Sequence, residues 1–315
     1  MTMFRKVLGA AAVAAAFASA MPAVASTVAI ADMNIFALGL FDAADLTIIA
    51  PGSIVIHSES RTGNATSSYN GVQGTGVGSN NLVSNVVGAS VDVKHRCAGA
   101  CGAATLALYG GNMENNALTH LATPGTQNFA LGDMFISGGV LGGGISGLTR
   151  ANAMSSGPDN EGNGNATILN TASYSSDFST ATTFTGKIGV GADSWLQVFV
   201  DSMLPTKGSA SAGFGWNVKV TSIGTFGDAG FGTLNFAPSD LNQGLLSTSF
   251  SENQVLNNIG MYYSDTKTFK EGFRYNFTIN QSSNANISEI PEPASLSLVG
   301  LALLGAGFAR RRAAK

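Results

Sequence analysis

The stretch Ser209–Val220, "SASAGFGWNVKV", alternates strictly between two kinds of side chain. Its even-numbered positions are apolar, and its odd-numbered positions are serine, glycine, asparagine and lysine. Successive side chains of a β-strand point to opposite faces of a sheet. The alternation therefore predicts a long strand with one face on a core and the other in water.

Other segments extend this pattern. "FRYNFTI" (Phe273–Ile279) and "TFTGKIGV" (Thr183–Val190) alternate in the same way, and "WLQVFV" (Trp195–Val200) indicates a strand buried on both faces. Links such as 191–194 and 227–230 carry turn residues, and short links join antiparallel strands. The only internal segment that could hold a short helix is 241–258. We therefore predict an all-β antiparallel sandwich, jelly-roll-like in connectivity. A glycine-rich β-helix is the alternative, although no repeat of fixed period supports it.

The composition limits the classes of partner. Charged residues make up only 11% of the chain, against roughly 25% in an average soluble protein. The body from Ser26 to Ile290 holds 10 basic and 18 acidic residues, a net charge of −8. It has no basic surface to neutralise phosphates, so we expect no nucleic-acid partner.

The first 25 residues have the three parts of a signal peptide. Arg5 and Lys6 are positively charged, Val7–Ala18 is an apolar run, and Ala23 and Ala25 fit the small-residue site that signal peptidase cuts. Cleavage after Ala25 is the prediction, with Ala20 as the alternative. The apolar run is short of the roughly 20 residues of a membrane span.

The C-terminus has a second ordered set of features. Pro291, Glu292 and Pro293 precede a largely apolar segment, 296–309, which is followed by Arg310, Arg311 and Arg312. A helix over this segment would reach about 20 Å, which makes it a marginal span for a hydrocarbon core of about 30 Å. The positive-inside rule places the three arginines in the cytoplasm and the prolines outside. The prolines favour an extended, accessible segment next to the membrane.

This order of parts resembles the PEP-CTERM sorting signal of Gram-negative bacteria. The same tail has also been catalogued as an ice-binding protein C-terminal domain. The resemblance implies processing by an exosortase, which cuts near the Pro-Glu-Pro motif and passes the protein to the cell surface or extracellular matrix. Such sorting systems are typically found beside exopolysaccharide production genes. "FGTLNFAPSDLN" (Phe231–Asn242) resembles, at low specificity, exported PEP-CTERM proteins with Ala/Ser-rich β domains.

These features predict four parts. They are a signal peptide (1–25), a β-rich extracellular body (26–280), a polar linker (281–289) and the sorting signal (290–315) with its membrane segment. The loop-like run 154–165 is where the body would divide, if it has two halves.

Two clusters could bind metal or form a crosslink. Cys97 and Cys101 are the only cysteines, and export to an oxidising compartment favours a disulfide between them. The alternatives are free thiols or a metal site that adds His95 and His120. Asp159, Glu161 and Asn163 have the spacing of half a calcium loop, but position twelve is Asn170 instead of a bidentate Glu, so calcium is a weak candidate and we expect no metal.

No catalytic residues or cofactors emerge from the sequence. The three histidines are scattered, and no nucleophile elbow marks a serine. We therefore expect a non-enzymatic exported protein with a structural or adhesive role in exopolysaccharide or biofilm. Its expected partners are signal peptidase, exosortase, the inner membrane during transit, and exopolysaccharide. A carbohydrate-binding module is the first alternative. The second is a secreted glycoside hydrolase, which would use a pair among the carboxylates Asp177, Asp193, Asp201 and Asp228.

Overall fold

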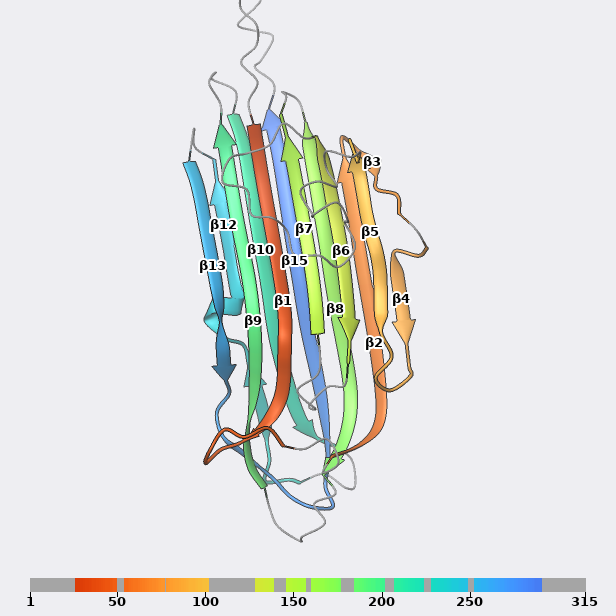
Figure 1. Cartoon of the computed structure of the whole chain (residues 1–315), viewed down its shortest axis with the longest axis vertical. Helices are drawn as coiled ribbons and strands as arrows, with labels where there is room; N and C mark the ends of the chain where they lie inside the picture. The colour runs from red at the N-terminus through yellow and green to blue at the C-terminus, as the bar shows by residue number, and fades with distance from the viewer. Residues whose placement is uncertain are drawn as a thin grey trace, which may run out of the picture.

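The computed structural model describes residues 26–49, 54–76, 78–101, 128–138, 146–156, 160–176, 184–201, 207–223, 228–248 and 252–290. These residues form two antiparallel β-sheets whose long strands run along the length of the molecule (Figure 1). The predicted antiparallel sandwich is confirmed, and the jelly-roll connectivity stays a prediction. Among the described residues, no helix is long and apolar enough to cross a membrane. The predicted span 296–309 lies outside them.

Sheet A has the strand order β13-β9-β1-β7-β6-β5, and β14 also pairs with β9. Its strands are β1 (Ser26–Asp42), β5 (Val91–Gly99), β6 (Phe129–Ser137), β7 (Ser146–Ser155), β9 (Phe184–Asp201), β13 (Glu252–Tyr263) and β14 (Lys267–Phe269).

Sheet B has the order β11-β10-β15-β8-β2-β3, with β12 also paired to β10 and β4 to β2. Its strands are β2 (Ile54–Tyr69), β3 (Val72–Gln73), β4 (Asn81–Ser84), β8 (Glu161–Ser176), β10 (Lys207–Ser222), β11 (Thr233–Phe236), β12 (Asn242–Ser247) and β15 (Arg274–Ile290), and the short 3-10 helix η3 (Ser239–Leu241) precedes β12. Strand β1 of sheet A contacts β15 and β10, while β6 contacts β8 and β2. The two sheets therefore pack face to face, and the strands that face each other follow the same order across both sheets.

The core lies between the sheets, where the alternating pattern predicts it. All six apolar side chains of the quoted stretch are buried, including Trp216 and Phe214. On β15, Tyr275, Phe277 and Ile279 are buried on the same face. Sheet A supplies the opposite wall, with Ala31 and Met33 of β1 among its members.

Two local predictions are wrong. Residues 191–194 are not a turn, because β9 continues through them for 18 residues. The described residues of segment 241–258 hold no helix beyond the end of η3; they form β12 and the first part of β13. In β13, exposed Asn253, Val255 and Asn257 alternate with half-buried neighbours. This two-residue period is typical of a strand and not of a helix.

The predicted linker 281–289 is also wrong, since these residues form the second half of β15 in the middle of sheet B. The segment is polar because several of its inward-facing side chains are polar and form hydrogen bonds inside the core. Gln281 Nε2 donates to the carbonyl oxygens of Met33 and Gly147, at 3.0 Å and 3.2 Å. Ser283 Oγ donates to Thr149 O at 3.0 Å. The folded body therefore extends to Ile290, ten residues past its predicted end at 280.

The chain does not divide at 154–165. Strand β1 pairs with β7, which precedes this run, and with β9, which follows it. Strand β8 likewise pairs with β2 and β15. Strands from both halves of the chain therefore share both sheets.

Candidate functional site

The end of strand β15 positions the C-terminal segment. β15 is paired on both sides: Ile290 lies opposite Lys207 of β10, and Ser288 lies opposite Glu161 of β8. The strand ends at Ile290, directly before Pro291. Proline has no N–H to donate to a ladder, which explains why the strand ends there. The C-terminal segment thus begins at a central strand of the sandwich.

The start of the body lies at the same end of the sandwich. The first residues of β1 and the last of β15 are neighbours at the top of Figure 1. Thr27 Oγ1 donates a hydrogen bond of 2.7 Å to Glu289 Oε1, and both side chains are buried. The backbone N–H of Glu289 also donates to Asn160 O at 2.9 Å. Residues 262 positions apart in the chain therefore fix the two ends of the body to each other.

Asparagine side chains connect the loops at this end. Asn160 Nδ2 donates to Ser155 Oγ at 2.9 Å, and Asn70 Nδ2 donates to Asn160 Oδ1 at 2.8 Å. Burial raises the pKa of the neighbouring Tyr69; a hydrogen bond with Ser155 opposes this and the charge of Glu289 adds to it. The tyrosine therefore stays neutral at physiological pH. The result is a firmly hydrogen-bonded end from which the tail departs.

The sequence-predicted site residues fall in different places. The signal peptidase residues Ala23 and Ala25 lie outside the described residues, as do Pro291, Glu292, Pro293, Arg310, Arg311 and Arg312. Cys97 at the end of β5 forms a disulfide with Cys101, and their Cα atoms are 6.0 Å apart.

The weak calcium candidate does not form a loop in the described residues. Glu161 and Asn163 belong to β8, where Asn163 Nδ2 donates to Asn286 of the adjacent strand, and Asp159 lies outside the described residues. Among the residues that the structure describes, no three histidine, cysteine or acidic side chains could share a metal ion.

The carboxylates considered for hydrolysis are not brought together where they are described. Asp193 and Asp201 are eight residues apart on β9, about 27 Å along an extended strand. Asp228 accepts hydrogen bonds from Lys270 Nζ at 3.0 Å and from Gly230 N at 2.9 Å. The Lys270 hydrogen bond holds the pKa of this carboxyl below its usual value. Asp177 lies outside the described residues.

Comparison with known proteins bears on the tail. Residues 289–313 match the family model of the PEP-CTERM protein-sorting motif. The chain carries a PEP-CTERM sorting motif. No curated protein and no solved structure matches the chain.

The PEP-CTERM motif overlaps the folded body. Its match begins at Glu289, so the last two residues of β15 belong to both. The motif implies an exosortase as processing partner, and it implies export through a membrane-anchored intermediate. The sandwich must therefore remain attached to the motif while the motif is in the membrane.

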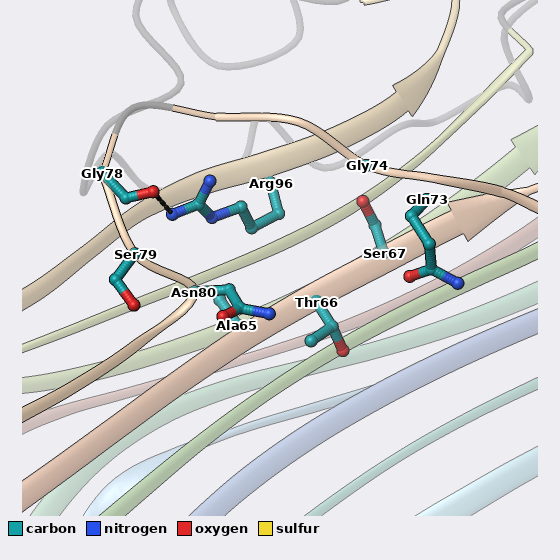
Figure 2. Close-up of a pocket in the computed structure, with 9 residues that line it drawn as sticks. All are labelled: Ala65, Thr66, Ser67, Gln73, Gly74, Gly78, Ser79, Asn80 and Arg96. Carbon is teal, nitrogen blue, oxygen red and sulfur yellow. Dashed lines mark hydrogen bonds between the residues drawn. The ribbon is translucent and has the colours of Figure 1, made fainter.

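A small pocket lies between β2 and the segment that follows β3 (Figure 2). Its volume is about 310 Å³, and its walls are mainly hydroxyl, amide and glycine groups: Ala65, Thr66, Ser67, Gln73, Gly74, Gly78, Ser79, Asn80 and Arg96. Arg96 of β5 donates to Gly76 O at 2.9 Å and to Gly78 O at 2.6 Å, which fixes the segment over the pocket. Ser67 is buried, and its Oγ has no hydrogen-bond partner among the residues that the structure describes. Without aromatic or large aliphatic walls, this pocket suits a small ligand rich in hydroxyl groups.

A group of buried charges lies on the face of sheet A that points away from sheet B. Arg150 of β7 lies in register between Asp32 of β1 and Asp133 of β6. Arg150 Nη2 forms an ion pair with Asp133 Oδ2, and both side chains are fully buried. Asp32 keeps some exposure as a residue, but its Oδ1 is buried and accepts no hydrogen bond from the described part of the chain.

Burial controls the ionisation of this group. It raises the pKa of Asp32 from 3.8 to about 7; Arg150 lowers this pKa, and the charges of Asp133 and Asp193 raise it. No motif in the sequence predicts this group of charges. The available signal is a lone charge inside an otherwise apolar strand, as in "IADMNIF" around Asp32.

Proposed function

We propose that this protein is an exported bacterial surface or extracellular-matrix protein whose body has a structural or adhesive, non-enzymatic role in exopolysaccharide. Signal peptidase removes the leader after Ala25. The tail then holds the protein in the inner membrane until an exosortase cuts near Pro291–Pro293. The match of residues 289–313 to the PEP-CTERM motif is the observation that carries this proposal.

The fold supports a membrane-proximal intermediate with a defined orientation. Only five residues, 291–295, separate the end of β15 from the proposed span 296–309. Five extended residues reach about 17 Å. The end of the sandwich that holds Thr27 and Glu289 is therefore the end that faces the membrane. The opposite end projects away from it.

Substitution of the three arginines tests the tether. We expect the extracellular form of the parent to lack both the leader and the residues beyond the Pro-Glu-Pro motif when its intact mass is measured. Replacing Arg310, Arg311 and Arg312 by glutamine should lower the yield of this processed form by roughly tenfold or more, because the positive charges hold the tail end in the cytoplasm. Replacing the same residues by lysine keeps the charge and should preserve the yield. Equal yields from the glutamine and parent proteins would contradict the proposal.

A carbohydrate-binding role is a second candidate, favoured by the pocket in Figure 2. The open face of sheet B adds to it, because most outward positions of β10 and β15 are serine, threonine, asparagine or glycine, with Lys219 and Arg274 among the exceptions. One row runs from Ser211 through Asn286 and Asn163 to Ser68, across four strands. The central part of this face offers uncharged hydrogen-bonding groups, which suit a neutral polysaccharide.

Binding to the exopolysaccharide purified from the producing bacterium tests this role. We expect saturable binding by the extracellular form. Asn80→Ala and Gln73→Ala should each raise the dissociation constant about 5- to 10-fold through the loss of a hydrogen bond in the pocket. Asn235→Ala removes an exposed amide on β11, outside the pocket, and should change nothing. If all three variants bind like the parent, the pocket is not the site.

A further inference from the structure

Strand β13 forms a long, open edge of sheet A. It pairs with β9 without interruption from Glu252, opposite Val200, to Tyr263, opposite Gly189. Among the described residues, no backbone hydrogen bond reaches β13 from its other side. This strand lies at the left border of the sandwich in Figure 1. In this twelve-residue strand, the N–H and C=O groups of alternate residues point away from β9 and present donors and acceptors along the edge.

The other edges of the sandwich are short or covered. Strands β3, β4, β11 and β12 have two, four, four and six residues. The edge at β5 is bridged by Thr75, whose N–H and C=O both bond Cys97 at 3.0 Å. Proteins usually protect an exposed edge with lysine, proline or a bulge. β13 has none of these protections, and its only charged residue is Glu252 at its first position.

The side chains of this edge are apolar and exposed. Val255, Ile259 and Met261 are 45%, 72% and 41% exposed. They alternate along the strand and therefore share the outer face of sheet A. Phe36, which is 47% exposed, lies beside Met261, since both side chains approach Gly191. The edge thus combines unpaired backbone with an apolar stripe.

We propose that β13 pairs antiparallel with β13 of a second copy of this chain, so that sheet A continues across a two-fold axis at Asn257. In this register Val255 of each copy lies opposite Ile259 of the other. Asn257 lies opposite itself, and Glu252 lies opposite Tyr262, so that no like charges meet. Moving the axis by one residue in either direction would place Asn257 opposite Ile259 or Val255. The register with its axis at Asn257 is favoured because it places the two β-branched residues opposite each other and asparagine opposite asparagine.

A second copy fits this edge better than an unrelated strand because the stripe is self-complementary. Each apolar cross-strand pair occurs twice in a symmetric interface, and each such pair is typically favourable. Strand β13 itself carries one acid per copy, Glu252, while Asp193 lies opposite Ile259 on β9 and Asp240 lies next to Asn258. Dimerisation does not depend on the proposed sorting route, because it requires only the folded sandwich.

A cysteine at the axis tests both the pairing and its register. Directly opposite residues of an antiparallel pair have Cα atoms about 4.5–5.5 Å apart, which suits a disulfide. Cys97 and Cys101 already form a disulfide, so a new cysteine supplies the only additional thiol of the described residues. The extracellular form of Asn257→Cys should run as a covalent dimer on a non-reducing gel. Asn253→Cys is the matched control and should stay monomeric, since its two copies would lie about 27 Å apart.

A charge on the stripe provides a second test. We expect the mass of the parent, measured by light scattering, to be that of a dimer, with a concentration-dependent fraction of monomer. Ile259→Lys should weaken the dimer about tenfold or more, because the substitution acts twice in the interface. Val83→Lys alters a similarly exposed residue (61%) on β4 and should leave the dimer intact. A monomeric parent, or equal crosslinking of Asn257→Cys and Asn253→Cys, would overturn the proposal.

Discussion

Replacing Arg150 by methionine should lower the free energy of unfolding by about 3–5 kcal/mol. Arg150 is fully buried and lies between two carboxylates, Asp32 and Asp133, on adjacent strands. Methionine fills a similar volume but carries no charge. The substitution therefore leaves Asp133 buried without its cation, and a buried ion pair broken on one side costs far more than an exposed pair.

The loss should be larger at pH 8 than at pH 5. Asp32 has a folded-state pKa of about 7, raised mainly by burial above the ordinary value of 3.8. A carboxyl group with a raised folded-state pKa binds its proton more tightly in the native state, so stability falls as the pH rises between the two values. Arg150 opposes this rise in pKa. Without Arg150, ionisation of Asp32 at pH 8 lowers the stability of the folded state further. At pH 5 the Asp32 carboxyl is protonated and neutral, so the loss of Arg150 does not add this cost.

Urea unfolding of the extracellular form at both pH values measures this effect. Lys94→Met is the control, because it breaks an ion pair with Asp92 whose side chains are 42% and 22% exposed. It should cost about 1 kcal/mol or less. A small loss for Arg150→Met, or a loss that is greater at pH 5, would show that the buried group does not behave as an ion pair.

Strict alternation made the centre of sheet B predictable from sequence. In β10 and the first half of β15, apolar and polar residues alternate without exception between Ala210 and Val220 and between Tyr275 and Ile279. A two-residue period can be recognised without knowing the partner strand, because it depends only on one face of the strand being buried. The predicted core residues of these strands, Trp216 and Tyr275 among them, are buried in the structure.

The second half of β15 could not be predicted in this way. Gln281 and Ser283 point into the core, where Gln281 Nε2 and Ser283 Oγ each lie close to Thr149 Oγ1, at 3.2 Å and 2.9 Å. Their partner is more than 130 residues away in the chain. A buried polar residue looks like a linker residue until its partner is known. The same limit hid the ion pair of Arg150, whose residues lie on different strands.

The candidate sites differ in how far sequence can predict them. The PEP-CTERM motif is a continuous segment, so its order of parts is visible in the sequence. The pocket combines residues from three separated segments, around Thr66, Gln73–Asn80 and Arg96. The open edge at β13 depends on strand order, which alternation does not specify. Sites made by folding therefore required the structure.

Replacing Gly164 by valine should destabilise the body by about 3 kcal/mol or more. Gly164 of β8 faces sheet A, and a Cβ atom at this position would lie 2.1 Å from Leu131 O and 2.9 Å from Asn152 N. The facing Gly132 of β6 has the same constraint, with Thr66 O and Asn165 O each 2.4 Å from its Cβ position. These obstacles are backbone atoms, so no side chain can rotate away to make room. The sheets would have to separate locally and lose core contacts on both sides.

Gly213→Val provides the matched control for this prediction. Gly213 lies on the open face of β10, where the nearest atom to its Cβ position is Asn284 Oδ1 at 3.4 Å. Valine is favoured over glycine in strands, so this variant should be as stable as the parent or more stable by up to about 1 kcal/mol. Urea unfolding of the two variants compares the same chemical change on the two faces of one sheet. If both lose stability equally, the cost comes from the loss of glycine itself. If only Gly164→Val loses stability, the close approach of the two backbones explains why this chain, which has 40 glycines, places some of them inside the core of the sandwich.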